Sequence, residues 1–290
     1  MSCIGAGNVD IQLDNPTFPS AGGEPSGNDA LSSSTNFSQK IFDPRSKADP
    51  LSGAAFIPPA QVNNFGAVSF SYKLEVPKGR AGVEPQIGLS YSSSGGDGWT
   101  GIGWSIGLGA ISRTTQYGAL RYDHNDTFTV GGKRLIKVAG PTLSANGVYR
   151  VEIEDGSFAR YELTQVESGG TWTVYDKNGG VTVYGETSTH RIARPDNITK
   201  VYTWQMSKTV DKSGNYLNVI YDDSEYAQKR ILYLKEIRYT GNTNGFAANQ
   251  YVRFYLKSRP DAYIAKSAGF IMQMDKLLDR IEMGWDNPQG

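Results

Sequence analysis

The feature that most constrains this chain is an alternation of apolar and polar residues with a period of two. In the run Val68–Val76 every second residue is apolar, and serine, lysine or glutamate stands between them. Successive side chains of a β-strand point to opposite faces, so this pattern predicts a strand with one buried face. Similar runs recur almost to the C-terminus and predict strands at 86–92, 107–115, 127–130, 135–138, 149–153, 158–163, 172–175, 181–184, 201–206, 217–221, 231–239 and 251–256.

The connectors between these runs favour hairpins. Asp155-Gly156 and Asn178-Gly179 lie between alternating segments, where type I′ turns need residues that tolerate positive φ. The chain is also rich in the residues that sheets and turns use, with 34 Gly, 17 Tyr and 11 Phe. We therefore expect an all-β fold of antiparallel sheets built from consecutive hairpins, either shell-like or sandwich-like.

Two details of the last third bear on this fold. The segment 271–283 fits both helical and strand spacing, and we favour a strand. Residues 176–184 resemble residues 211–221, since each begins with Asp-Lys and a glycine-containing turn and continues as a strand. Such a repeat is typical of hairpin units that pack one against the next.

The first 64 residues have a different composition. They are rich in Ser, Gly, Asn and Pro and lack hydrophobic periodicity, which predicts a disordered tail ahead of one domain at 65–290. Cys3, the single cysteine, excludes an internal disulfide. It is a candidate for a lipid anchor, and a free thiol on the tail is the alternative.

Charge and hydropathy exclude several partners. Lys plus Arg and Asp plus Glu both number 29, so no net field attracts nucleic acid or an anionic membrane. No run of about 18 apolar residues predicts a transmembrane segment.

The stretch Val76–Arg113 is unusually dense in glycine and tryptophan. Its glycines permit a tight backbone path, and Trp99 and Trp104 are too large to remain in water cheaply, so we expect them to hold the loop onto a sheet. Arg113 is expected to stack on one of these rings or to bond backbone carbonyls. The structural motif residues are Pro77, Gly79, Gly82, Pro85, Tyr91, Gly98, Trp99, Gly101, Gly103, Trp104 and Arg113.

Residue spacing offers little support for chemistry. The glycines do not match a nucleotide-binding fingerprint. The turn 123–126 has oxygen ligands suited to calcium but lacks an EF-hand pattern, which favours a solvated turn. No partner is visible for His124, His190, Ser112 or Ser157, and the carboxylates of Glu152 and Glu154 are ordinary for an exposed strand face. We predict no catalytic, cofactor-binding or metal-binding residues.

The motif, together with Trp172–Gly185, Ile237–Tyr239 and Val252–Phe254 with Arg259 and Asp261, resembles one family. It is similar to the N-terminal domain of the Salmonella virulence plasmid B (SpvB) family, which also opens the B subunit of insecticidal ABC toxin complexes. The resemblance covers about residues 64–285. It implies an exported protein in which this domain precedes Rhs or YD repeats, propeller repeats or a toxic domain.

In the toxin complexes, the resemblance implies, such a domain forms part of a hollow β shell around a toxic polypeptide. The ADP-ribosyltransferase of the Salmonella relative lies in a separate C-terminal domain that this sequence does not match, so we expect no enzyme activity. The expected function is a structural module that helps to enclose, carry or secrete a toxic segment. The expected partners are following segments of a longer polypeptide or a toxin-complex subunit, and the expected location is outside the bacterium or on its surface, with host cytoplasm as a destination of related toxins. A stand-alone adhesin-like or protein-binding β module is the alternative.

Overall fold

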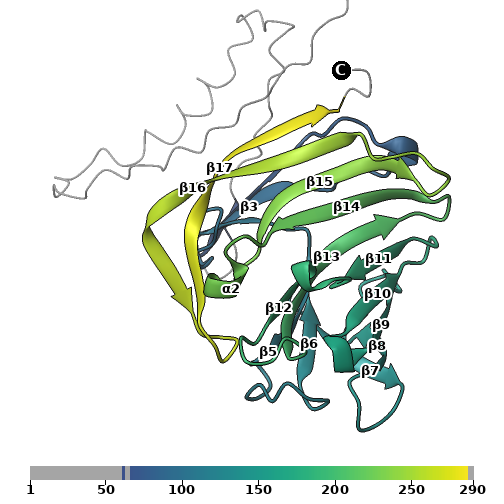
Figure 1. The fold of residues 1–290 in the computed structure, drawn as a ribbon, viewed down its shortest axis with the longest axis vertical. Helices are drawn as coiled ribbons and strands as arrows, with labels where there is room; N and C mark the ends of the chain where they lie inside the picture. The colour runs from purple at the N-terminus through teal and green to yellow at the C-terminus, as the bar shows by residue number, and fades with distance from the viewer. Residues whose placement is uncertain (1–60, 63–65, 287–290) are drawn as a thin grey trace, which may run out of the picture. The chain divides into compact units, whose positions relative to one another are not determined.

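The computed structural model describes residues 61–62 and 66–286, and these residues fold mainly as antiparallel strands (Figure 1). A small sheet forms first, with its strands in the order of the chain. It consists of β1 (Gln61–Val62), β2 (Val68–Lys73), β3 (Gly88–Ser92) and β4 (Trp104–Ile106).

A large sheet contains the remaining strands, and almost every strand pairs with the next one in the chain, so the predicted all-β fold of consecutive hairpins is confirmed. The order is β11-β10-β9-β8-β7-β6-β5-β13-β14-β15-β16-β17, and β12 pairs with β13 beside this path. The strands are β5 (Ala110–Thr114), β6 (Thr127–Val130), β7 (Lys133–Ala139), β8 (Gly147–Val151), β9 (Arg160–Thr164), β10 (Thr171–Tyr175), β11 (Val181–Tyr184), β12 (Arg191–Ala193), β13 (Val201–Val210), β14 (Asn215–Asp222), β15 (Tyr233–Asn242), β16 (Gln250–Ala265) and β17 (Met272–Trp285). The described helices are single turns at Arg80–Gly82, Val166–Ser168, Ser188–His190 and α2 (Tyr226–Lys229).

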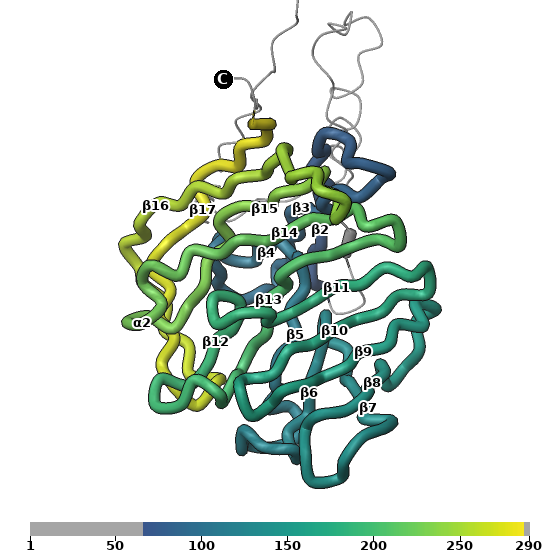
Figure 2. The backbone as a smooth tube through the Cα atoms, turned by 45° about the vertical axis from the view of Figure 1, so that its right-hand side comes forward, coloured from purple at the N-terminus to yellow at the C-terminus, as the bar shows by residue number. Residues whose placement is uncertain are grey.

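Strand β13 closes part of this sheet on itself. Its first half pairs with β5, where Trp204 lies opposite Ile111, and its second half pairs with β11, where Lys208 lies opposite Val183. The strands β5 to β11 and β13 therefore form a closed ring, while β14 to β17 continue from β13 as an open sheet (Figure 2).

The ring encloses an aromatic core. The ring of Phe128 packs edge-on against Trp172 at 5.1 Å and against Trp204 at 5.7 Å, and Trp172 also contacts Tyr149 at 5.0 Å. Both tryptophans are fully buried. Edge-to-face geometry is favourable for such rings, so this cluster stabilises the ring beyond its buried area.

A second core lies between the small sheet and the strands β14 to β17. Leu74 and Ile87, which flank strands β2 and β3, are buried there with Ile237, Val252 and Phe254. The pairings place the aromatic residues of the small sheet on one face and mostly serines on the other. The period-two alternation thus determines which face of the small sheet enters the core.

Two hairpin loops share an aspartate-capped geometry, and one of them differs from its predicted turn type. In the loops Asp176–Gly180 and Asp211–Asn215, an aspartate carboxylate accepts backbone N–H groups from the third and fifth residues. Among the residues of these loops only glycine has positive φ, at Gly179 (+86°) and Gly214 (+79°). The type I′ prediction is wrong for Asn178-Gly179, and for Asp155-Gly156 too, because that turn needs positive φ at both central residues. The two loops share one geometry, which accounts for the sequence repeat.

The first and last described strands can be compared with the segments expected from the sequence. Residues 1–60, including Cys3, lie outside the described residues, but Gln61 and Val62 fall within the expected tail and pair with β2. The ambiguous segment 271–283 is part of strand β17, as favoured. Strand β16 is much longer than the expected 251–256, because its hairpin with β17 continues past an irregular pairing after Ser258.

Candidate functional site

The motif segment 76–113 leaves strand β2 and fastens first onto β15. The hydroxyl of Tyr239 donates to the Pro77 carbonyl at 3.1 Å. The Arg80 guanidinium donates to the Thr240 carbonyl at 3.2 Å. These contacts join residues about 160 positions apart in the chain.

The loop itself depends on a glycine. A Cβ on Gly79 would lie 2.0 Å from the Val83 carbonyl oxygen, so no other residue fits there. The N–H of Gly79 donates to the Glu84 carboxylate at 2.9 Å and is the main reason that the pKa of Glu84 lies below its usual value. Gly82 takes a φ of +82°, and Pro85 is buried at the end of the loop.

Trp104 packs within the small sheet. Its ring lies 5.2 Å from Tyr91 on β3 and 6.1 Å from Phe70 on β2. Gly103 precedes it with a φ of +77°, and a Cβ there would lie 2.7 Å from the Tyr91 ring. The close approach of tyrosine and backbone therefore explains this glycine.

Trp99 holds the glycine-rich loop against the large sheet. Its ring meets Phe254 of β16 at 6.2 Å, and its carbonyl accepts the Leu278 N–H of β17 at 2.6 Å. Gly98 and Gly101 form the turn around it, and Gly101 has a φ of +104°. The expectation that the tryptophans hold the loop onto a sheet agrees with these contacts.

A buried ion pair fixes the other end of this loop. The Arg259 guanidinium, 2% exposed, donates to both carboxylate oxygens of Asp97 at 3.1 and 2.6 Å, and also to Asp261. These bonds to Asp261 and Asp97 raise the pKa of Arg259 above its ordinary value. Arg259 and Asp261 belong to the motif recognised in the sequence, whereas Asp97 was not predicted, and its signal is an acidic residue inside a glycine run.

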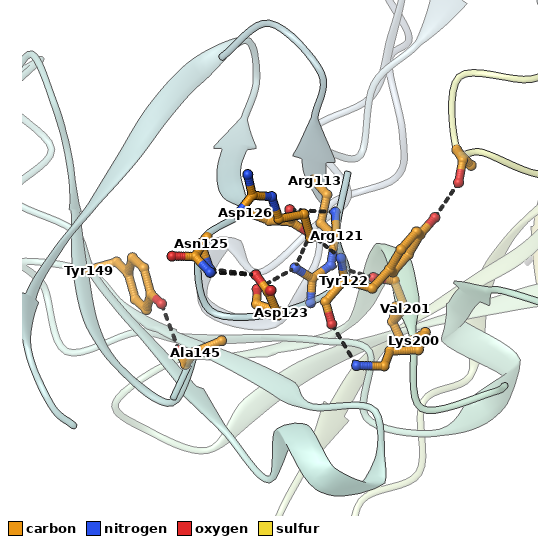
Figure 3. A network of polar contacts seen from close by, with 11 residues as sticks. Arg113, Arg121, Tyr122, Asp123, Asn125, Asp126, Ala145, Tyr149, Lys200 and Val201 are labelled. Atoms are coloured by element: carbon orange, nitrogen blue, oxygen red, sulfur yellow. Dashed lines mark hydrogen bonds and ion pairs between the residues drawn. The ribbon is translucent and has the colours of Figure 1, made fainter. Parts of the chain in front are cut away.

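Arg113 organises a separate network inside the ring (Figure 3). It forms an ion pair with Asp126 at 2.7 Å, and the two side chains are 6% and 2% exposed. It also donates to the backbone carbonyls of Val201 at 2.8 Å and Asp123 at 3.0 Å. The network ties strand β5 to β13 and to the loop before β6.

The predicted stacking of Arg113 is only partly right. Its guanidinium lies over the rings of Phe128 (4.9 Å), Tyr122 (5.4 Å) and Trp204 (5.6 Å). Stacking on either tryptophan of the glycine-rich loop is a wrong prediction, because Arg113 shares a face of β5 with Ile111, and that face points into the ring. The alternative, bonding of backbone carbonyls, is confirmed.

The acidic turn 123–126 contacts Arg113 through Asp126 and the Asp123 carbonyl, while His124 and Asn125 are exposed, as expected for a solvated turn. The Asp126 carboxylate accepts the backbone N–H groups of Arg121 at 2.8 Å and Tyr122 at 2.7 Å as well as the guanidinium. Asp123 bonds the Asn125 N–H at 2.8 Å. Within 61–62 and 66–286, no group of three or more His, Cys, Asp or Glu side chains is placed to hold a metal ion.

Burial shapes the protonation of this network. It lowers the pKa of Arg113, and the Asp126 carboxylate opposes that effect. It raises the pKa of both Tyr122 and Tyr149 to about 12. Tyr149 donates to the Ala145 carbonyl at 2.6 Å, so both the geometry and the pKa keep its phenol protonated.

Tyr122 also links the ring to the tip of the β16–β17 hairpin. Its hydroxyl donates to the carbonyl of Ala268, a fully buried residue of that tip. Its own carbonyl accepts the Lys200 ammonium at 2.8 Å, and its φ is +59°. The non-glycine residue in this conformation is held by bonds at both ends.

The serine and histidine side chains considered for catalysis bond different partners. His190 bonds the Thr187 hydroxyl at 2.8 Å and the Val219 carbonyl at 3.0 Å, while Ser112 bonds Thr203 at 3.0 Å. These contacts do not pair a serine with a histidine.

In the described part of the chain, no helix is long and apolar enough to span a membrane.

The carboxylates of Glu152 and Glu154 have different partners. Glu152 pairs with Arg134 at 3.3 Å, whereas Glu154 accepts the backbone N–H of Gly156 at 2.8 Å. Glu154 therefore caps its own loop.

Curated proteins similar to this chain are named as enzymes. Mono(ADP-ribosyl)transferase SpvB of Salmonella typhimurium and that of Salmonella enteritidis are each 26% identical over 210 residues, which cover 61% of this chain and 35% of the relative. The chain thus matches about a third of the length of these relatives. The prediction that the chain is not an enzyme is contradicted by their names. That prediction rested on the spacing of candidate residues and on the implied position of the transferase in a separate domain, whereas the matching relatives carry the transferase name.

Solved structures share the fold. The N-terminal domain of the effector protein SpvB from Salmonella typhimurium strain LT2 superposes with a TM-score of 0.61 at 21% identity, covering 74% of this chain and 88% of that one. The TcdB2-TccC3 structure gives a TM-score of 0.67 at 21% identity, covering 79% of this chain and 14% of that one.

The family model for the Salmonella virulence plasmid 65kDa B protein matches residues 62–266. The matched region contains the whole motif from Pro77 to Arg113 and also the Asp97–Arg259 ion pair. With most of its length inside this match, the chain belongs to the SpvB family.

Proposed function

We propose that this chain is a structural module of an exported bacterial toxin of the Rhs-like or toxin-complex type, where it adds strands to a β shell that encloses or carries a toxic segment. The observation that carries the proposal is an open edge on the large sheet. Strand β17 is the last strand in the sheet order, so among residues 61–62 and 66–286 no strand lies along its outer side.

A backbone hydrogen bond at the end of β17 determines which groups on this edge point outward. The N–H of Asp286 donates to Asn249 at 2.7 Å, toward β16, and residues of an antiparallel strand alternate in direction. Ile281, Met283 and Trp285 therefore direct their N–H and C=O groups away from β16. In the part of the chain that the structure describes, their outward N–H groups have no acceptor.

The glycine-tryptophan loop sets the limit of this free edge. On the far side of the irregular pairing near Asp279, the N–H of Leu278 points outward and is taken by the Trp99 carbonyl. The loop thus covers one position and leaves the stretch from Ile281 onward available. Trp285, 54% exposed, adds an apolar side chain at the same place. An uncovered strand edge is a template for a further strand.

The relatives support the toxin setting. The TcdB2-TccC3 structure contains this fold as a small part of a long chain, and the curated relatives carry a transferase name. Export, attachment to repeat-rich segments and association with a toxin-complex subunit belong to the same proposal. The transferase activity of those relatives is a separate candidate for the polypeptide carrying this module, and transfer of labelled ADP-ribose from NAD to proteins of a host-cell lysate tests it.

The edge is tested by light scattering and amide exchange on the purified chain. We expect association that increases with concentration and fast exchange at Ile281, Met283 and Trp285 in the monomer. The variant Met283→Pro removes an outward N–H together with the Met283 side chain, which packs against the second core, and should remain monomeric. Met283→Ala loses the same side chain but keeps the donor, and should associate. A monomeric chain in which these amides are protected would refute the proposal.

A second candidate is a stand-alone binding module. The face of β16 and β17 opposite the core carries arginines stacked on tyrosines, with Arg253 over Tyr251 at 3.6 Å and Arg280 over Tyr255 at 3.9 Å. A cleft of about 570 Å³ beside them is lined in part by Arg253, Tyr255 and Lys276. Tyrosine and arginine dominate protein interfaces. Loss of cell-surface binding in Arg280→Ala, with Met283→Pro unaffected, would favour this candidate.

A further inference from the structure

A small pocket lies beside the second core, the one between the small sheet and β14 to β17. It has a volume of about 270 Å³ and is formed by the link between β4 and β5 together with β13, β14 and the start of β15. Its walls are largely apolar and include Trp99, Leu108, Leu232 and Leu234. The pocket lies apart from the β17 edge and is independent of the function proposed above.

Two polar side chains line this pocket without partners. Tyr221 is 9% exposed, and within 61–62 and 66–286 its hydroxyl takes part in no hydrogen bond. The side-chain amide of Gln205 also lacks a hydrogen bond there. The Tyr221 hydroxyl is not among the buried side-chain atoms that lack a partner, so it is open to the pocket and free to bond water or the acceptor of a ligand.

A second phenol, that of Tyr184, lies close to one of the residues that line the pocket. A Cβ on Gly109, which lines the pocket, would be 3.6 Å from the Tyr184 hydroxyl oxygen. Tyr184 is also 9% exposed, and the described residues offer its hydroxyl no hydrogen-bond partner. Two nearly buried phenols thus approach one small space.

The lining excludes an ionised ligand. No Asp, Glu, Lys, Arg or His is among the residues that line the pocket. A charge placed there would lose its hydration without a counter-ion. Both phenols are protonated hydrogen-bond donors at neutral pH, since the ordinary tyrosine pKa is near 10 and burial raises that of Tyr221 and Tyr184 further.

We propose that this pocket binds a small, flat, uncharged molecule with an apolar body and a hydrogen-bond acceptor such as a carbonyl oxygen, which the Tyr221 hydroxyl engages. Apolar walls with a few converging polar groups are the usual composition of small-molecule sites. The volume is just below the usual range of about 300–1,000 Å³, which limits the ligand to one or two fused rings. The ring of Trp99 supplies a stacking surface.

The uncharged fluorescent naphthyl ketone Prodan is a suitable probe, because it combines a flat apolar body with one carbonyl. Titration into the full chain should give saturable binding with a blue shift of its emission. Energy transfer from tryptophan should accompany binding and fall in the variant Trp99→Phe, since Trp99 lines the pocket.

Tyr221→Phe removes the hydroxyl and keeps the ring, and should weaken Prodan binding about three- to tenfold, as expected for one hydrogen bond. Tyr216→Phe is the matched control on the same strand, because that hydroxyl makes only a 3.5 Å contact with Phe246 outside the pocket. Leu108→Trp should fill the space and abolish saturable binding. Thermal melting of each variant identifies any that fail to fold.

Three results would overturn the proposal. The wild-type chain could show no saturable Prodan binding, which would mean that the pocket holds water only. Tyr221→Phe could bind as tightly as Tyr216→Phe, which would remove the hydroxyl from recognition. A folded Leu108→Trp variant could bind normally, which would place Prodan at another surface.

Discussion

Replacing Asp126 by alanine should destabilise the fold more than any single change of an exposed charge. The substitution leaves the Arg113 guanidinium buried without a counter-ion, since the two side chains are 6% and 2% exposed. Breaking a buried ion pair on one side costs about 3–5 kcal/mol. Two carbonyl acceptors of Arg113 remain, which favours the lower part of this range, while the N–H of Tyr122 loses its acceptor, which raises it again by about 1 kcal/mol. We expect a loss of about 4 kcal/mol in the free energy of unfolding.

Urea denaturation and thermal melting measure this loss. For a domain of this size, 1 kcal/mol corresponds to about 2–4 °C, so the midpoint should fall by roughly 8–16 °C. Asp196→Ala is the matched control, because the Arg194–Asp196 pair has the same 2.7 Å separation but lies at the surface. Exposed pairs contribute little, so no measurable change is expected there.

A double variant separates the cost of the unpaired charge from lost packing. Arg113→Met combined with Asp126→Ala removes both charges. Its loss in the free energy of unfolding should be smaller than the sum of the two single losses by more than about 1 kcal/mol. The reasoning would be refuted if Asp126→Ala melted like Asp196→Ala, or if the double variant lost the full sum of both single changes.

Three further predictions follow from glycine strain, loop anchoring and buried phenols. Gly103→Ala should lower the free energy of unfolding by about 1–3 kcal/mol in urea denaturation, because its φ is +77° and its Cβ would meet the Tyr91 ring. Gly107→Ala is the control and should be neutral, since the space at its Cβ is open. Equal effects of the two changes would contradict this prediction. Asp97→Asn should speed amide exchange in residues 98–103, since it weakens the anchor to Arg259, and unchanged exchange would show that Trp99 alone holds the loop. Burial raises the pKa of Tyr149 and Tyr184 to about 12 in the fold, above the ordinary value near 10, so the stability they contribute is complete below pH 10 and is lost as pH rises toward 12; a flat alkaline profile would argue against their burial.

Much of the local structure could be predicted because it depends on neighbours in the chain. The alternation at Val68–Val76 predicted strand β2 and its buried face, and the similarity of residues 176–184 and 211–221 predicted two related hairpins. The turn type was wrong, since an aspartate side chain that accepts two backbone N–H groups allows a five-residue loop in which a single glycine takes positive φ.

The ion pairs could not be predicted in the same way. Arg113 and Asp126 are close in sequence, yet their pairing requires the side chain of Arg113 to face the interior of a closed ring. Asp97 and Arg259 are 162 residues apart and meet only because β16 and β17 pack beside the glycine-rich loop. Spacing along the chain carries no information about such contacts.

The sequence by itself determined the fold class, the hairpin order and the family, because strand alternation, turn residues and the motif from Pro77 to Arg113 are all local patterns. Long-range packing alone shows that β13 closes a ring, that the outer edge of β17 is free among the described residues, and that the Tyr221 phenol lines a small pocket. The physical reason is that a period of two specifies which face of a strand is buried, but not which strand lies beside it.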